Sequence, residues 1–235
     1  MRERLESFDV SRLTLLSPRR LSDETTVEVD GGWNDGEHLQ CDVFGVLSLR
    51  NEKTSTVILN SLSDEDFLFS WYRDVFVQDH VALALRQSAL VGFELLPTLV
   101  RSPNAKNAPK LWEMRVTGFA GFASSKVKVE KSQFCADHRV ATYRTDGHFF
   151  EMIDPLKWDG SDLFTIWPFP LSYVASERFE RFCKKRQFSG IVFESLFDRS
   201  LSGQASPGLP AKWLSAQNVE RLNRDVDYVE CIDKA

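Results

Sequence analysis

The stretch that decides the fold is Trp158–Leu196, WDGSDLFTIWPFPLSYVASERFERFCKKRQFSGIVFESL. The apolar run 163–169 predicts a buried strand, which the nearby prolines end. Ser176 can cap a following helix, because its hydroxyl can accept a hydrogen bond from a free N–H group of the first turn. Gly190 ends this helix, and the apolar residues after it predict another strand. The stretch therefore predicts a strand, a capped amphipathic helix and a further strand.

A similar pattern occurs earlier, in residues 75–96, VFVQDHVALALRQSALVGFELL. When the two stretches are aligned, Gly92 meets Gly190 and Val81 meets Phe179. The identity is low, so convergence of unrelated segments on one supersecondary pattern is an open alternative. The pattern predicts an α+β fold with mixed or antiparallel sheets, in which two strand–helix–strand units form a pseudo-duplicated body.

A polar, proline-containing segment, residues 101–109, predicts a linker or an exposed loop between the two units. We expect an N-terminal α/β half in residues 1–100, with the first unit. A C-terminal half in residues 111–235 would hold the second unit and a final helix near residues 213–222. At 235 residues the chain is long enough for two such halves, or for one compact domain into which both halves pack.

The composition is ordinary for a soluble globular protein, with 43% hydrophobic and 27% charged residues. The net charge of −5, without a basic stripe, argues against a nucleic-acid partner. No apolar run approaches the length of a membrane span, and the first residues lack the apolar core of a signal peptide. We therefore expect a cytoplasmic protein with no membrane partner. The four cysteines are too scattered for a disulfide framework, which leaves reduced thiols or metal ligands.

Sequence motifs of common catalytic sites are missing. There is no phosphate-binding glycine loop, no G-x-S-x-G and no H-E-x-x-H in the chain. Asp159 and Asp162 form an acidic pair, but a turn explains both residues without catalysis, since Asp is a standard turn and cap residue. The residues alone therefore offer no recognisable catalytic site.

Two short pairs of metal-ligand residue types occur in the chain, His38-x-x-Cys41 and Cys135-x-x-His138. Each pair lies near a predicted turn or strand edge, and together they would supply a tetrahedral Cys2His2 set for zinc. Their separation in sequence is far longer than in a zinc finger. The alternative is ordinary surface histidines with partly buried thiols. We therefore expect either no cofactor or one structural zinc bound by these four residues.

A family resemblance rests on residues 111–197, and its most specific part reads WDGSDLF, WPFP, ASERF and SGIVF in this order. This part resembles the double-CXXCG motif proteins, bacterial proteins that include the immunity partners of swarming-inhibition toxins in myxobacteria. The N-terminal half matches that family only loosely. The matching segments belong to the scaffold. The resemblance therefore supports a fold more than it supports a particular functional site.

The chain departs from this family in its naming motif. A Cys-x-x-Cys-Gly motif is expected twice, but the matching places begin at Cys41 and Cys135 and read CDVFG and CADHR. The zinc site implied by the family carries over only to Cys41, Cys135 and His138, with His38 as a fourth ligand that this sequence alone offers. Phe44 replaces one ligand and cannot bind a metal, which favours a decayed site in which packing replaces the ion.

The resemblance implies an immunity protein that neutralises one cognate toxin by stoichiometric protein–protein contact, and therefore a protein that is not an enzyme and has no catalytic residues. This task requires a rigid platform and a patch that complements the toxin in shape and charge. The acidic residues Asp64, Glu65 and Asp66 would suit a basic toxin. The same run also predicts the start of a helix capped by Ser63 and continuing into residues 67–72.

A second hypothesis belongs to a different class of protein. In it the chain is a zinc-binding regulatory or metal-dependent protein that uses the cluster of His38, Cys41, Cys135 and His138. It predicts about one zinc per chain, and loss of metal and function in Cys135→Ser. A third hypothesis is a structural homologue that has lost its toxin, in which degenerate cysteine motifs are expected.

Overall fold

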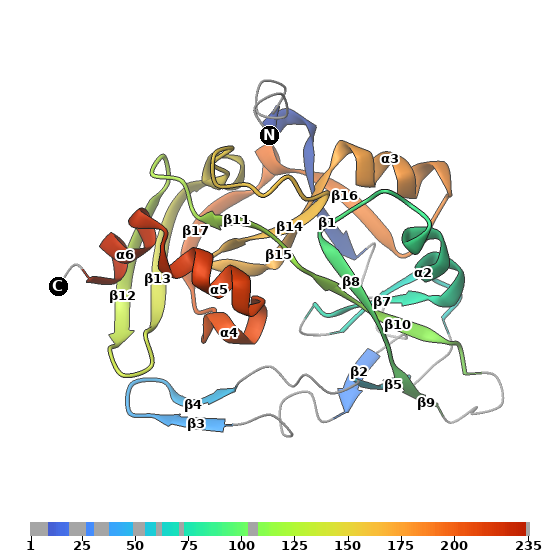
Figure 1. The fold of residues 1–235 in the computed structure, drawn as a ribbon, viewed down its shortest axis with the longest axis horizontal. Helices are drawn as coiled ribbons and strands as arrows, with labels where there is room; N and C mark the ends of the chain where they lie inside the picture. The colour runs from blue at the N-terminus through green and yellow to red at the C-terminus, as the bar shows by residue number, and fades with distance from the viewer. Residues whose placement is uncertain are drawn as a thin grey trace.

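The computed structural model describes residues 9–18, 27–30, 38–48, 55–59, 63–70, 73–102 and 108–233 (Figure 1). This part of the chain forms mixed and antiparallel β-sheets with short helices packed on them, which confirms the predicted α+β class. None of the helices in these ranges combines the length and the apolar content that crossing a membrane would require.

The elements fall into two larger sheets, several smaller sheets and a set of short helices. The strands of the larger sheets are β1 (Leu13–Pro18), β6 (Phe67–Phe69), β7 (Val75–Gln78), β8 (Phe93–Pro97), β10 (Leu111–Val116), β11 (Gly118–Phe122), β14 (Leu163–Trp167), β15 (Phe169–Ser176) and β16 (Ile191–Ser195). The smaller sheets contain β2 (Val27–Asp30), β3 (His38–Cys41), β4 (Gly45–Ser48), β5 (Thr56–Leu59), β9 (Leu99–Arg101), β12 (Lys128–Cys135), β13 (Val140–His148) and β17 (Ser200–Ala205). The α-helices are α2 (Asp79–Arg86), α3 (Glu177–Lys185), α4 (Pro210–Trp213), α5 (Ala216–Asn223) and α6 (Val226–Asp233).

The two predicted strand–helix–strand units are present and are built alike. In the first unit β7 leads into α2 and then β8, and in the second unit β15 leads into α3 and then β16. Ser176 caps α3 as predicted, since its hydroxyl accepts a hydrogen bond from the N–H of Phe179 at 3.2 Å. Gly92 and Gly190 both have positive φ, at +101° and +82°, and each directly precedes the last strand of its unit.

The sheets of the two units have the same order and register. In one sheet β10 lies between β7 and β8, and in the other β1 lies between β15 and β16, antiparallel to both neighbours in each case. Leu111 of β10 pairs with Gln78, the residue before α2, and Leu13 of β1 pairs with Ser176, the residue before α3. Strand β1, from near the N-terminus, therefore takes the place in the second unit that β10 takes in the first.

The units contact each other through equivalent aspartates. Asp162, just before β14, accepts a hydrogen bond from the N–H of Val91 at 3.1 Å. Asp66, just before β6, accepts one from the N–H of Ser189 at 2.8 Å. Each aspartate thus accepts a hydrogen bond from the other unit, from the residue that directly precedes Gly92 or Gly190. This reciprocity is the pattern of a two-fold interface between two copies of one unit.

The predicted N-terminal and C-terminal halves share both strands and core. Strand β1 belongs to the first half in sequence but to the sheet of the second unit in space. One hydrophobic cluster contains Val81 of α2 together with Phe179 and Cys183 of α3. Figure 1 accordingly shows α2 and α3 on the same side of the molecule. The predicted C-terminal helix corresponds to α5, which α4 and α6 flank.

The helix predicted to start at Ser63 is wrong. Residues 63–65 are irregular, and Phe67–Phe69 form β6, in which Phe67 pairs with Val77. The Ser63 hydroxyl does accept a backbone hydrogen bond, from the N–H of Glu65 at 3.2 Å, but this closes a local turn. All three residues of β6 are buried, and pairing with β7 buries them better than one face of a helix could.

Candidate metal centre

Two β-hairpins meet at the candidate metal centre. Strands β3 and β4 are antiparallel, with Cys41 opposite Gly45 next to the turn. Strands β12 and β13 are also antiparallel, with Cys135 opposite Val140. Each cysteine is therefore the last strand residue before a hairpin turn. In Figure 1 the tip of the β12–β13 hairpin points toward the tip of the β3–β4 hairpin.

The two turns share a backbone feature. Gly45, four residues after Cys41, has φ +72°, and Arg139, four residues after Cys135, has φ +51°. Both values lie in the left-handed region, which glycine adopts readily and other residues adopt at a cost. The positive φ reverses the chain at the same position after each cysteine. Arg139 thus takes the backbone conformation in the second turn that Gly45 takes in the first.

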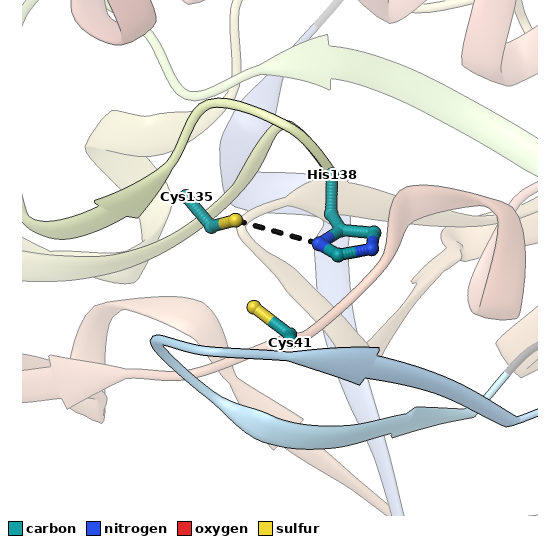
Figure 2. A group of neighbouring side chains, drawn as sticks. All are labelled: Cys41, Cys135 and His138. Carbon is teal, nitrogen blue, oxygen red and sulfur yellow. Dashed lines mark hydrogen bonds between the residues drawn. The ribbon is translucent and has the colours of Figure 1, made fainter.

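Three of the predicted ligands come together at these turns. The ligand atoms of Cys41, Cys135 and His138 all lie within 4.8 Å of one another, and Cys135 Sγ is 3.4 Å from His138 Nδ1. Figure 2 shows the two sulfur atoms and the imidazole directed into the space between the hairpins. In a tetrahedral zinc site the ligand atoms lie about 3.5–3.8 Å apart, as bond lengths of about 2.0–2.3 Å require. The group could therefore hold a metal ion.

The surroundings of the thiols are apolar. Cys41 is 4% exposed and Cys135 is 6% exposed, whereas His138 is partly exposed. The two cysteines belong to a hydrophobic cluster whose other buried members are Leu47, Val140 and Leu209. In these surroundings a free thiolate would be costly, so each sulfur is either a neutral thiol or a thiolate that binds a cation.

The backbone of the first turn stabilises the thiolate of Cys41. Burial raises the pKa of this thiol, but the N–H groups of Phe44 and Val43 and the Cys135 thiol lower the pKa by more, so the net shift is downward. A metal binds the thiolate form, so a lowered pKa reduces the competition from protons. We did not foresee these N–H groups from the sequence. The turn that ends at Gly45 is the sequence signal that could have indicated them.

The fourth ligand position differs from the family pattern. Phe44 stands where the first motif would have its second cysteine, and its partly buried ring packs against the same hydrophobic cluster. The backbone of His38 begins β3, but its side chain lies outside the described residues. Across the part of the chain that the structure describes, the candidate site therefore has three ligands, Cys41, Cys135 and His138. The predicted participation of His38 stays a prediction.

The acidic run that we predicted to bind a toxin lies elsewhere, at the junction of the two units. Asp66 is 17% exposed, and its carboxylate lies 2.7 Å from His80 Nε2 in addition to its bond from Ser189. This carboxylate is therefore used within the fold. Asp64 is exposed and Glu65 is partly exposed. A role of these residues in toxin binding stays a prediction.

The acidic pair of Asp159 and Asp162 is also engaged within the fold. Asp159 accepts hydrogen bonds from the N–H of Ser161 at 3.0 Å and from the N–H of Phe119 at 2.8 Å. Asp162 accepts one from the Ser176 hydroxyl at 2.8 Å, besides its contact with the first unit. These hydrogen bonds within the fold therefore account for both aspartates.

Comparisons with known proteins do not assign a family. No protein-family model matches the chain, and a search of curated proteins finds no match either. The resemblance to the double-CXXCG motif proteins therefore rests on the residues quoted above. The fold and the site define the chain as an α+β protein with a Cys2His group that could hold a metal ion.

Proposed function

We propose that the chain is an immunity protein, which neutralises a cognate bacterial toxin by stoichiometric contact and acts without catalysis. The observation that supports this proposal is the convergence of Cys41 with Cys135 and His138. These residues stand at the two places where the resemblance puts the CXXCG motifs. A chance similarity confined to residues 111–197 would give no reason for Cys41 to lie against Cys135.

The metal in this proposal is one zinc ion with a structural role. Two thiolates and an imidazole are ligands that zinc prefers, and apolar residues surround both thiols. The ion would join two hairpins that lie far apart in sequence. Because it would bind the folded chain, it would stabilise that state and make the binding platform rigid. A rigid platform limits the ordering cost of association.

For the contact with the toxin we propose Asp64 and Glu65, which lie beside the junction of the units. Asp64 is exposed, and both side chains can offer negative charge to a basic partner. Asp66 would support this surface from within, because Ser189 and His80 hold its carboxylate.

Co-expression with the toxin encoded by a neighbouring reading frame tests the function. We expect rescue of growth, and a titration of toxin activity by the purified protein that ends at one chain per toxin. Reversing the charges of Asp64 and Glu65 to Lys should weaken rescue, while Asp146→Lys, at an exposed position in β13, should not. Rescue at far below one chain per toxin would exclude a stoichiometric inhibitor.

A second candidate function is a zinc-binding regulatory or metal-dependent protein. The group of three protein ligands, Cys41, Cys135 and His138, favours it, because such a site leaves a coordination position for water or another molecule, as catalytic zinc sites do. Elemental analysis of the purified chain should then give about one zinc, and Cys135→Ser should lose both metal and function. Metal-free protein that is folded and still protects cells would contradict this candidate and the structural zinc of the first proposal, and would leave only stoichiometric immunity intact.

A further inference from the structure

We propose that Cys41 and Cys135 form a disulfide when a peroxide acts on the metal-free protein. The hairpins β3–β4 and β12–β13 would then be joined by a metal ion in one state and by a covalent bond in the other. The cross-link itself follows from the positions of the two thiols. The prediction that a bound metal prevents the cross-link rests on the metal site of the proposed function.

The positions of the two thiols carry this inference. Cys41 Sγ and Cys135 Sγ belong to one group whose ligand atoms lie within 4.8 Å of one another. Figure 2 shows both sulfur atoms directed into the space between the hairpins. An S–S bond of about 2.05 Å needs a further approach, which rotation about the Cα–Cβ bonds can supply. Each cysteine ends a strand at a hairpin turn, where small backbone movements cost least.

The other two cysteines lie in different surroundings. Cys183 of α3 is buried in the cluster shared by the two units. Cys231 of α6 packs against another cluster, with its sulfur 3.9 Å from the carbonyl oxygen of Val129. Of the four cysteines, Cys41 and Cys135 alone share a hydrophobic cluster. A cross-link within one folded chain is therefore expected at this pair.

The reaction balances with hydrogen peroxide as the oxidant. One thiol is oxidised first: its sulfur bonds to a peroxide oxygen, the O–O bond breaks, and a sulfenic acid and one water result. The second thiol then attacks this sulfur, the S–O bond breaks, and the hydroxyl group leaves with the second thiol's proton as another water. The two thiols together lose two protons and two electrons, which the peroxide gains in becoming two water molecules.

A bound metal should prevent this reaction. A thiolate that coordinates zinc shares the electron pair with which it would attack the peroxide, and the ion keeps the two sulfurs apart at ligand spacing. Oxidation and metal binding would therefore exclude each other. The chain would lose its metal under oxidising conditions without losing the connection between its hairpins.

Thiol counting and peptide mapping on the full chain test the proposal. Metal-free protein, prepared with a chelator, and zinc-loaded protein are each treated with hydrogen peroxide under native conditions. In the metal-free sample we expect free thiols to fall from four to two per chain, with the Cys41 peptide linked to the Cys135 peptide. In the zinc-loaded sample we expect all four thiols to remain over the same time.

Variants and a second measurement make the result decisive. Cys183→Ser with Cys231→Ser should keep the cross-link, whereas Cys41→Ser or Cys135→Ser alone should abolish it. Prolonged oxidation of the zinc-loaded protein should release zinc in step with the Cys41–Cys135 link, which tests the pair even if the metal-free chain is unfolded. The proposal is overturned by a link through Cys183 or Cys231, or by zinc release without any link. Equal oxidation rates with and without zinc would refute only the prediction that bound zinc prevents the link.

Discussion

At the scale of single residues, Phe44 determines how complete the metal centre is. It occupies the place of the second cysteine of the first turn, and its ring packs against the apolar cluster around Cys41 and Cys135. The N–H of Phe44 still supports the Cys41 thiolate, because a backbone group does not depend on the side chain. Phe44 therefore offers no ligand atom, although its turn presents the Cys41 thiol.

Phe44→Cys should restore a fourth ligand and tighten zinc binding by at least about tenfold, since a further Zn–thiolate bond forms in a turn of suitable shape. Competition with a chromophoric chelator measures the affinity. Val43→Cys is the matched control, because Val43 is 44% exposed and adds a thiol in the same turn away from the cluster. An equal gain in the two variants would show that Phe44 does not occupy a ligand position.

Lys157 is the second decisive residue, since it ties the C-terminal helices to the body. Its Nζ lies 2.8 Å from Asp225 Oδ1 and 2.6 Å from Asp227 Oδ2, and the Asp225 side chain is 7% exposed. Burial lowers the pKa of Lys157, but hydrogen bonds to the two carboxylates raise it by more, so the net shift is upward. This contribution to stability is therefore present below the ordinary pKa of 10.5 and is lost as pH rises through the folded-state pKa.

Lys157→Ala should lower the free energy of unfolding at pH 7 by about 3–5 kcal/mol, because it leaves the carboxylate of Asp225 buried without its cation. Urea denaturation gives this value. Lys126→Ala removes an exposed lysine and should change stability by less than about 0.5 kcal/mol. The difference between the variants should shrink above the ordinary pKa of lysine. A loss of under about 1 kcal/mol in Lys157→Ala would refute this role.

At the scale of elements, the glycine that follows each unit's helix controls how closely the units approach. A Cβ on Gly92 would lie 2.1 Å from the carbonyl oxygen of Leu163, and a Cβ on Gly190 would lie 2.1 Å from that of Phe67. Both distances are far inside van der Waals contact, and both obstacles are backbone atoms. Each glycine therefore allows its backbone to approach the backbone of the other unit closely.

Gly92→Ala and Gly190→Ala should each destabilise the protein, by amounts similar to each other and about 2 kcal/mol or more beyond the control Gly208→Ala. Gly208 also has positive φ, at +75°, but a Cβ there would meet nothing within 4 Å. Gly208→Ala therefore has the strain of a positive φ but no steric clash of the added Cβ. Thermal or urea unfolding measures all three variants. If one of the first two tolerated Ala, the interface would not be reciprocal.

Local signals made much of this architecture predictable. The strand–helix–strand units follow from the serine cap at Ser176, the helical spacing of apolar residues and the terminal glycines, and these signals lie within about twenty residues of one another. The place of β1 had no such signal, because pairing between Leu13 and Ser176 depends on contacts across most of the chain. The run after Ser63 was mispredicted because its acidic residues imitate a helix start, while pairing with β7 decides its structure.

The candidate site was predictable to a similar extent. Residue type and spacing indicated Cys41, Cys135 and His138, and their convergence agrees with that expectation. The sequence could not indicate that Arg139 takes the left-handed conformation of the missing glycine, since an arginine gives no signal for a positive φ. It also could not indicate that Asp66 serves the contact between the units, because its partner Ser189 lies in the second unit.

At the scale of the whole molecule, two contacts join distant parts of the chain. The reciprocal interface between the strand–helix–strand units combines them into one core, and the candidate metal centre connects the β3–β4 hairpin to the β12–β13 hairpin. The first contact consists of apolar side chains and backbone hydrogen bonds. The second depends on what lies between two thiols and an imidazole (Figure 2). In the proposed immunity function, a metal bound there would hold the two hairpins together and make the binding platform rigid.

X-ray absorption at the zinc edge, on purified protein loaded with one equivalent of zinc, shows which atoms bind the metal. The spectrum should show two sulfur ligands at about 2.3 Å and at least one imidazole nitrogen at about 2.0 Å. Cys41→Ser with Cys135→Ser should remove the sulfur shell. A first shell of nitrogen and oxygen alone in the unsubstituted protein would contradict the metal centre formed by Cys41, Cys135 and His138.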